Sequence, residues 1–274
     1  MKFLFGGKLR SILAATLMAG GILVNSQSVF AQGADDNSPQ NSPAESLSGS
    51  ELFAKLLENN HSRDGRLQRY SETRRYVVTN QKGKIHAATE VRLHYHAPNE
   101  KSFDTLCEEG SGTVRNLVFR RLMESEVETA SGRSHRDSSI TPVNYEFQFL
   151  SEEDGNGRHY FVVQAIPRRK DKYLFEGKIW IDSQDFAIAK IEGQPARNPS
   201  FWIHRVDFVR QYQKIGDFWL PLKDESITHL KIVGTKILTI EHFDYTVNSS
   251  ETRVDSPNHN SRGCQVAQTA QVTQ

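Results

Sequence analysis

The chain has 274 residues, with 34 Lys and Arg against 33 Asp and Glu, which gives a formal net charge of +1. A near-neutral chain does not fit a protein that binds nucleic acid through bulk positive charge. Once the polar ends are set aside, about 200 residues remain, which suits one domain with a sizeable core.

The first 31 residues have the features of a secretory signal peptide. Three basic residues precede an apolar stretch at residues 11–24, and small residues occupy positions −3 and −1 of a cleavage site before Gln32. Residues 17–21 approach a bacterial lipobox, but Gly21 occupies the cysteine position, so no thiol is available for acylation. We expect cleavage, a secreted mature chain of net charge about −2 and no transmembrane span. The alternative is an uncleaved anchor, although the stretch is shorter than the ~20 residues that cross a bilayer.

Polar segments flank the remaining chain. Residues 32–48 and 249–274 are rich in polar residues and contain too few apolar ones to offset the entropy of ordering the backbone. We expect both segments to be disordered, which leaves residues 49–248 as the folded domain.

Two helices are predicted within this domain. Ser48 or Ser50 can cap the first one, which should end near Asn59 and Asn60. Its apolar stripe consists of Leu52, Phe53, Leu56 and Leu57. The second helix has apolar residues at positions 114, 117, 118 and 122, and it precedes a polar loop at 131–139.

The other predicted elements are strands, because hydrophobicity alternates with a period of two. Between Ile85 and Tyr95 the odd positions are mostly apolar and the even positions mostly polar. Ten such segments occur, at residues 70–79, 85–95, 102–107, 143–149, 160–166, 173–181, 186–192, 203–213, 218–227 and 235–247. No crossover helices separate them, so we predict a mainly β (α+β) fold built on an antiparallel sheet.

Candidate reactive groups are few. His94 and His96 project from one strand face with a spacing that could provide two metal ligands, but a solvated face is the favoured interpretation because no third ligand has a recognisable spacing. The basic run Pro167–Lys172 could meet an anionic headgroup or an acidic partner, although a charged hairpin connection is the simpler interpretation. Cys107 and Cys264 either pair or remain free thiols. We predict neither catalytic residues nor a cofactor, since no nucleophile-elbow, Walker, dinucleotide or zincin motif occurs.

Aromatic residues exceed what two helices would readily cover, which indicates an apolar cleft on one face of the sheet. Core packing remains the default for any single aromatic residue. The predicted ligand-binding residues alternate with polar neighbours and should point inward; they are Leu93, Tyr95, Phe147, Phe149 and Phe208.

The hairpin "GKIWIDSQDFAIAKIEG" at residues 177–193, with the order of elements around it, resembles the LolA-like family of periplasmic outer-membrane lipoprotein-sorting proteins. The segments "KDKYLFEGKIWID" and "IGDFWLP" are similar to those of one branch of this family. The residues that carry the resemblance are turn and packing positions: Gly177, Trp180, Ile181, Asp182, Lys190 and Gly193.

This resemblance implies an unclosed antiparallel β-barrel whose concave, helix-covered side holds acyl chains or another apolar ligand. The implied function is that of a soluble periplasmic carrier of a lipidated protein or other hydrophobic ligand, with donor and acceptor membrane complexes as further partners. Two alternatives stay open. One is an envelope sensor or interaction module of the same fold that binds a protein partner, and the other is a secreted hydrolase with an unrecognised site.

Overall fold

A computed structural model describes residues 48–129, 138–232, 234–249 and 264. The predicted signal peptide, nearly all of the polar segment 32–48, the centre of the polar loop at 131–139 and most of the C-terminal tail lie outside the described residues.

The described residues form a long helix, a second helical segment and ten strands. The helix is α1 (Gly49–Asp64). The second segment consists of α2 (Gly112–Val114), a π-helical stretch η2 (Arg115–Phe119) and α3 (Arg120–Thr129). The strands are β1 (Arg69–Asn80), β2 (Ile85–His96), β3 (Glu100–Gly110), β4 (Tyr145–Gly155), β5 (Arg158–Pro167), β6 (Phe175–Asp182), β7 (Ile188–Pro195), β8 (Ile203–Ile215), β9 (Phe218–Leu230) and β10 (Gly234–Val247).

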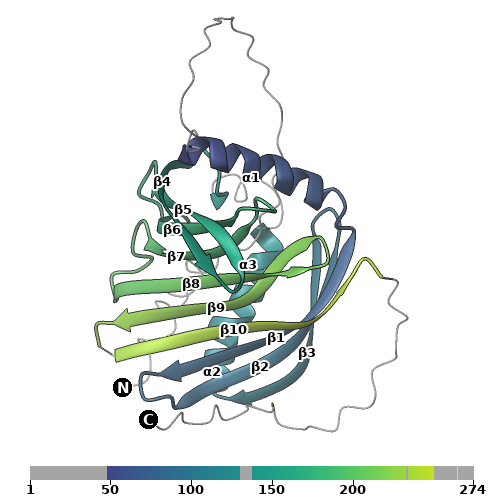
Figure 1. The fold of residues 1–274 in the computed structure, drawn as a ribbon. Coiled ribbons are helices and arrows are strands. Elements are labelled where there is room, and N and C mark those ends of the chain that lie inside the picture. The colour runs from purple at the N-terminus through teal and green to yellow at the C-terminus, as the bar shows by residue number, and fades with distance from the viewer. Residues whose placement is uncertain (1–47, 130–137, 233, 250–263, 265–274) are drawn as a thin grey trace, which may run out of the picture.

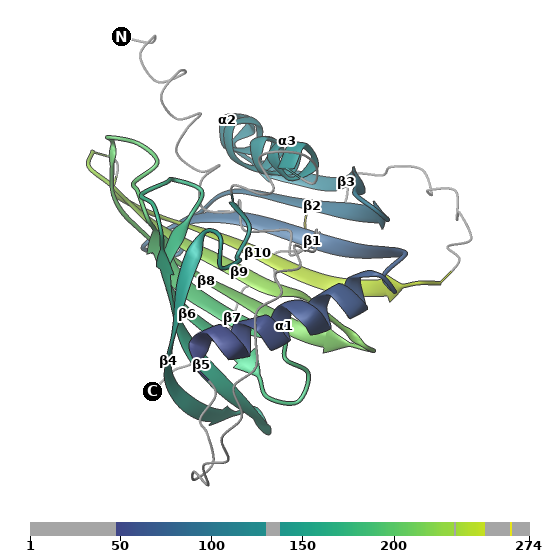
Figure 2. The same ribbon diagram turned by 90° about the horizontal axis from the view of Figure 1, so that it is seen from above.

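All ten strands belong to one antiparallel sheet in the order β3-β2-β1-β10-β9-β8-β7-β6-β5-β4. The sheet is curved and does not close, since β3 and β4 lie at opposite edges (Figures 1 and 2). The prediction of a mainly β fold with an open antiparallel sheet is confirmed. The joining of β1 to β10 could not be predicted from local pattern, because it pairs residues at opposite ends of the domain, such as Val77 with Thr239.

Both helical segments pack against the same face of this sheet. One row of register partners crosses nine strands from Phe147 on β4 through Ala165, Gly177, Gly193, Phe208, Ser226, Leu238 and Val78 to Ala87 on β2. Side chains in one row share a face. Phe147 packs with α1, whereas Val78 and Ala87 pack with η2 and α3. We call this face, which carries both helices, the inner face.

The N-terminal half of α1 lies directly on β4. Ser48 and Glu51 form a capping box, in which the Glu51 side chain accepts a hydrogen bond from the Ser48 backbone at 2.7 Å. The Phe53 ring stacks on that of Phe147 with centroids 3.6 Å apart. A methyl group added at Gly49 would lie 2.6 Å from the Phe147 carbonyl oxygen, so glycine permits this close approach.

The predicted end of α1 near Asn59 and Asn60 is wrong, because the helix continues to Asp64. Asn60 and Arg63 are buried on the face of the helix that also buries Leu56, and Arg63 donates a hydrogen bond to the Asn60 side chain at 2.6 Å. Tertiary contacts therefore override the low helix propensity of asparagine.

Glycine brings β6 and β7 together at the centre of the sheet. Gly177 and Gly193 are direct register partners. A methyl group at Gly177 would lie 1.9 Å from the Glu192 carbonyl oxygen, which no real side chain tolerates. The glycines of this hairpin are thus explained by backbone proximity.

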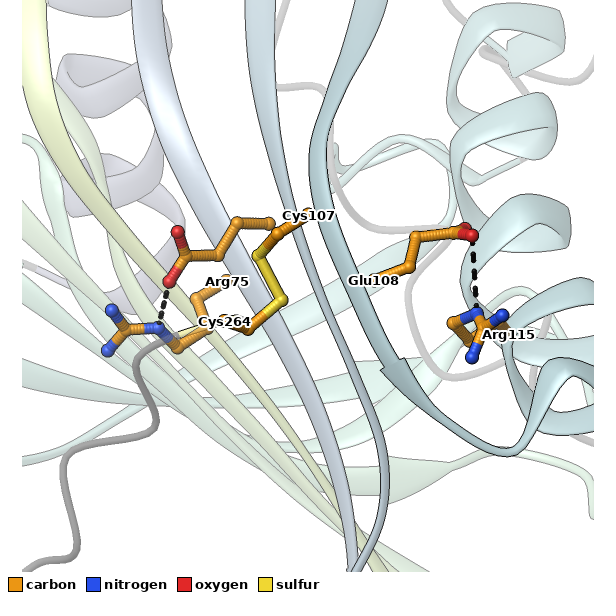
Figure 3. The surroundings of a disulfide bond; sticks show 6 residues. Arg75, Cys107, Glu108, Arg115 and Cys264 are labelled. Carbon is orange, nitrogen blue, oxygen red and sulfur yellow. Dashed lines mark hydrogen bonds and ion pairs between the residues drawn. A yellow bond between two sulfur atoms is a disulfide. The ribbon is translucent and has the colours of Figure 1, made fainter. Parts of the chain in front are cut away.

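A disulfide joins Cys107 on β3 to Cys264, so the structure resolves the two alternatives left open by the sequence in favour of pairing. Figure 3 shows this bond on the side of β3 where Arg75 lies, whereas Glu108 turns to the other side and pairs with Arg115 of η2 at 3.4 Å. Cys264 therefore lies on the outer side of the sheet, away from the helices.

Candidate functional site: a cleft between two helices

A cavity of about 120 Å³ lies on the inner face, where α1 ends. Most of its wall is aromatic or aliphatic, and we call it the inter-helix cleft. Its lining includes Leu67, Tyr70, Tyr95, Ile188, Tyr212, Phe218, Trp219 and Leu220. Polar and charged residues complete the wall: Asn60, Arg63, Asp64, Arg74 and Lys101.

The C-terminal turn of α1 forms one wall and is held by Arg63. Its guanidinium donates hydrogen bonds to the backbone carbonyls of Asp185 and Phe186 in the β6–β7 turn. Burial lowers the pKa of Arg63, against the opposing effect of the nearby Asp185 carboxylate. The Arg63 side chain therefore attaches the helix end to the β6–β7 turn through main-chain oxygens.

The β6–β7 turn that receives Arg63 is itself organised by a buried carboxylate. Asp182 is fully buried and accepts hydrogen bonds from the Arg158 guanidinium and, at 2.8 Å, from the Asp185 backbone. Asp185 in turn accepts a hydrogen bond from the Trp219 indole at 3.0 Å, which fixes this ring in the cleft wall. The aspartates of the hairpin motif thus position cleft residues and do not line the cleft.

The opposite wall is an ion cluster that joins the sheet to α3. Arg74 on β1 bonds Glu72 at 2.7 Å and Glu126 of α3 at 2.6 Å, and Lys101 on β3 bonds Glu126 at 2.7 Å. Burial raises the pKa of the Glu126 carboxyl, but Arg74 and Lys101 outweigh this effect and hold that pKa well below its ordinary value. Glu126 is therefore ionised near neutral pH, with cationic side chains from two strands beside it.

The cluster continues across β10 to the centre of the sheet. His242 lies 2.8 Å from Glu72 and 3.5 Å from Asp224, and Asp224 pairs with Arg210 at 2.7 Å. Burial lowers the pKa of His242, but the two carboxylates outweigh it and raise the pKa above its ordinary value. For Glu72, the effect of burial is outweighed by Arg74 and His242, which lower its pKa to about 2.

The five predicted ligand-binding residues all lie on the inner face, but in two separate groups. Leu93 and Tyr95 belong to the cluster beside the cleft, and Tyr95 lines it. Phe147, Phe149 and Phe208 lie in or against the core under α1. Ligand binding by these five residues stays a prediction, and the structure brings only Tyr95 to the cleft wall.

Sequence reasoning missed most of the cleft and all of the ion cluster. Glu72 and Arg74 alternate with small polar and charged residues on β1, so this strand shows no contrast between its two faces. The strand pattern nevertheless indicated burial of Glu72 and Arg74, because these positions share a face of β1 with Tyr76 and Val78, which are buried. Buried charges on one strand, however, become interpretable only with their partners on α3 and β10.

The remaining motifs have ordinary surroundings. His94 lies 3.3 Å from Asp104 on β3, and His96 is exposed. Residues 168–174 form the β5–β6 connection, as the simpler interpretation of the basic run expected. Within residues 48–129, 138–232, 234–249 and 264, no three His, Cys, Asp or Glu side chains gather as metal ligands would.

None of the helices in the described part of the chain has the length and apolarity needed to cross a membrane.

The fold and the cleft define a mainly β protein with an open sheet covered by helices on one face. Residues 69–248 match the model of DUF5686, described as a family of unknown function, and the chain belongs to this family. The match spans all ten strands and begins after α1. No curated protein matches the chain.

Several solved structures are similar in fold. A LolA superfamily protein from Nitrosomonas europaea is 11% identical with a TM-score of 0.35, over 75% of this chain and 96% of that one. A putative outer membrane lipoprotein-sorting protein domain from Vibrio parahaemolyticus is 14% identical with a TM-score of 0.37, over 74% and 95%. The MucA/MucB complex from Pseudomonas aeruginosa contributes a chain that is 10% identical with a TM-score of 0.27, over 74% and 99%. Among these structures is the LolA-like family that the sequence resembles, at low identity and with TM-scores below 0.5.

Proposed function

We propose that this protein is a soluble periplasmic carrier that holds a lipoprotein acyl chain or another hydrophobic ligand in the inter-helix cleft. The observation that carries the proposal is the aromatic lining of this cleft between the end of α1 and the ion cluster. Few polar groups among many apolar ones are typical of small-molecule sites. The features of a signal peptide in residues 1–31 and the disulfide both favour an oxidising compartment outside the cytoplasm.

The size of the cleft limits what it can hold in this conformation. A cavity of about 150 Å³ is enough for a benzene molecule, so 120 Å³ admits one ring or a short stretch of chain. A longer acyl chain would need the end of α1 to separate from the sheet, which requires Arg63 to leave the carbonyls of Asp185 and Phe186. The carrier works by binding and release, without catalysis.

This size also favours a second function. One aromatic or leucine side chain of a protein partner would fill the cleft as it stands, and buried aromatic anchors of this kind supply much of the affinity of protein interfaces. In this alternative the protein is an envelope interaction module, and the cleft takes a side chain in place of a lipid.

The test is binding of a fluorescent fatty acid to the wild type and to Leu220→Trp, which fills the cleft from β9. Leu220 is 6% exposed, whereas Leu222 on the same strand is 40% exposed, so Leu222→Trp is the matched control. We expect the first variant to lose binding by at least about tenfold and the control to bind as the wild type does. Equal binding by both variants, or none by the wild type, would exclude the carrier.

Native mass spectrometry of the protein purified from the periplasm without detergent separates the two functions. Co-purified lipid that is absent from Leu220→Trp supports the carrier. A bound protein that is lost from the same variant, without lipid, supports the interaction module.

A further inference from the structure

The hairpin loops at the two ends of the sheet differ sharply in charge. At one end lie the β1–β2, β5–β6, β7–β8 and β9–β10 connections, at residues 81–84, 168–174, 196–202 and 231–232. They contain eight Lys or Arg and one acidic residue, Asp171. At the other end the hairpin loops 97–99, 156–157, 183–187 and 216–217 contain Asp185 and Asp217 but no Lys or Arg.

The four basic connections are neighbours in space. In the strand order, the hairpins β2-β1, β10-β9, β8-β7 and β6-β5 follow one another directly. In Figure 1 the ends of β10, β9 and β8 that carry these loops lie together on the left side of the sheet. We call the four loops the basic end.

Large apolar side chains project from the middle of this basic end. Phe201 is 76% exposed and Ile232 is 70% exposed. The Lys231 ammonium lies 3.8 Å from the centre of the Phe201 ring, and the Lys231 backbone bonds the Trp202 carbonyl at 3.0 Å. The β7–β8 and β9–β10 loops thus form one tip, in which Phe201, Trp202 and Ile232 accompany Lys231.

A small apolar core at the base of this tip holds it in place. Ile203 and Val206 are buried and form a small core with Trp202 and Leu230. Phe201 and Ile232 are therefore exposed on a loop tip that has a packed core of its own. Two large apolar side chains held in solvent on a packed base carry a cost that contact with an apolar phase would remove.

Apolar tips beside cationic side chains match the chemistry of a bilayer interface. Aromatic rings settle at the level of the headgroups, Lys and Arg extend their charges toward lipid phosphates, and each such cation near an anionic surface contributes to binding. An acidic protein surface would satisfy the lysines and arginines but would leave Phe201 and Ile232 without an apolar environment. The combination favours lipid.

We propose that the basic end docks the protein on an anionic membrane surface, with Phe201, Trp202 and Ile232 inserted at the interface and the basic residues facing the headgroups. This inference is independent of what the inter-helix cleft binds. The far end of the sheet, where Asp185 pairs with Arg158 and Lys214 and Asp217 pairs with Arg66, points away from the membrane in this arrangement.

The experiment is flotation of the full-length protein with vesicles of phosphatidylcholine alone or with phosphatidylglycerol added. We expect binding to the anionic vesicles that weakens as salt is raised. Phe201→Ser with Ile232→Ser should weaken it at least about tenfold, and Lys82→Gln with Lys84→Gln at least about fivefold. The matched controls are Leu150→Ser, which removes an exposed leucine at the β4 edge, and Arg121→Gln, which removes an exposed cation on α3. Any contribution of the N-terminal segment is common to all variants.

Insertion has its own readout, because vesicles with brominated acyl chains should quench tryptophan fluorescence in the wild type and much less in Trp202→Phe. The inference would be overturned by equal binding to neutral and anionic vesicles. It would also be overturned if the Phe201/Ile232 variant bound as the controls do, or if no vesicle bound while an acidic protein partner did.

Discussion

The two halves of the inner face bury a helix by different physical means. Under α1, the contact with β4 to β8 is a mainly apolar core in which Phe53 stacks on Phe147. Under α3, an apolar cluster around Tyr76 and Phe119 continues into the Arg74 ion cluster. Apolar packing is insensitive to pH and salt, whereas buried ion pairs depend on both partners and on protonation. The two helices should therefore respond differently to the same perturbation.

The largest effect is expected from a charge placed under α1. Phe147→Glu would put a carboxylate against Phe53 at a position that is 5% exposed, and an unpaired buried charge costs several kcal/mol. We expect loss of the cooperative thermal transition, whereas Phe147→Leu should remain folded. A folded Phe147→Glu protein with a melting temperature near that of the wild type would show that α1 does not bury position 147 in an apolar core.

Removal of one cation should be the equivalent perturbation of the α3 half. Arg74→Met leaves Glu72 and Glu126 in buried surroundings with fewer partners, which we expect to cost about 3–5 kcal/mol of unfolding free energy in urea. The double variant Arg74→Met with Glu126→Leu should recover part of this loss, since it removes a stranded carboxylate. If the double variant lost more unfolding free energy than the two single variants together, charge compensation would not hold the cluster together.

Acid should sharpen the difference between the halves. Glu72 has its pKa lowered from 4.5 to about 2, so its stabilising contribution is present above pH 4.5 and is lost as the pH falls toward 2. His242 has its pKa raised, so its contribution is complete below pH 6.5 and is lost as the pH rises through the raised value. The cluster is therefore strongest between these limits. In hydrogen exchange at pH 3, amides of α3 should lose protection before those of α1, and the reverse order would contradict this account.

The smallest effect concerns the N-terminal cap of α1. Ser48→Ala removes the hydroxyl that accepts from the Glu51 backbone, which should cost about 1 kcal/mol. The change should accelerate hydrogen exchange in the first turn of α1 and leave α3 unaffected. Ser48→Asp, which keeps an acceptor at the cap, should exchange as the wild type does.

Local pattern predicted the elements well and their assembly poorly. The alternation in residues 85–95 placed β2 within a residue at its C-terminal end, because one face of that strand is buried throughout. On β4 the predicted strand ended at Phe149, but pairing with β5 extends it to Gly155, where Glu152 and Glu153 no longer alternate with apolar residues. The aromatic surplus indicated a cleft on one face of the sheet but not which residues line it, since α1 buries Phe147 and leaves Tyr95 at the cavity. That division depends on where the helix lies, which sequence periodicity does not encode.

Because β1 pairs with β10, the sheet can be completed only after the last strand has been synthesised. Until the last strand is available, β1 to β3 have no strand partner among β4 to β9 in the described part of the chain, because β10 lies between the two groups. The join is made over pairs as distant in sequence as Val77 and Thr239, so the chain must close its longest loop to complete the sheet. A chain that lacks β10 could form at most two separate sheets, each with an exposed edge. A stop codon before β10 would leave both halves unjoined, however well each one had begun to fold.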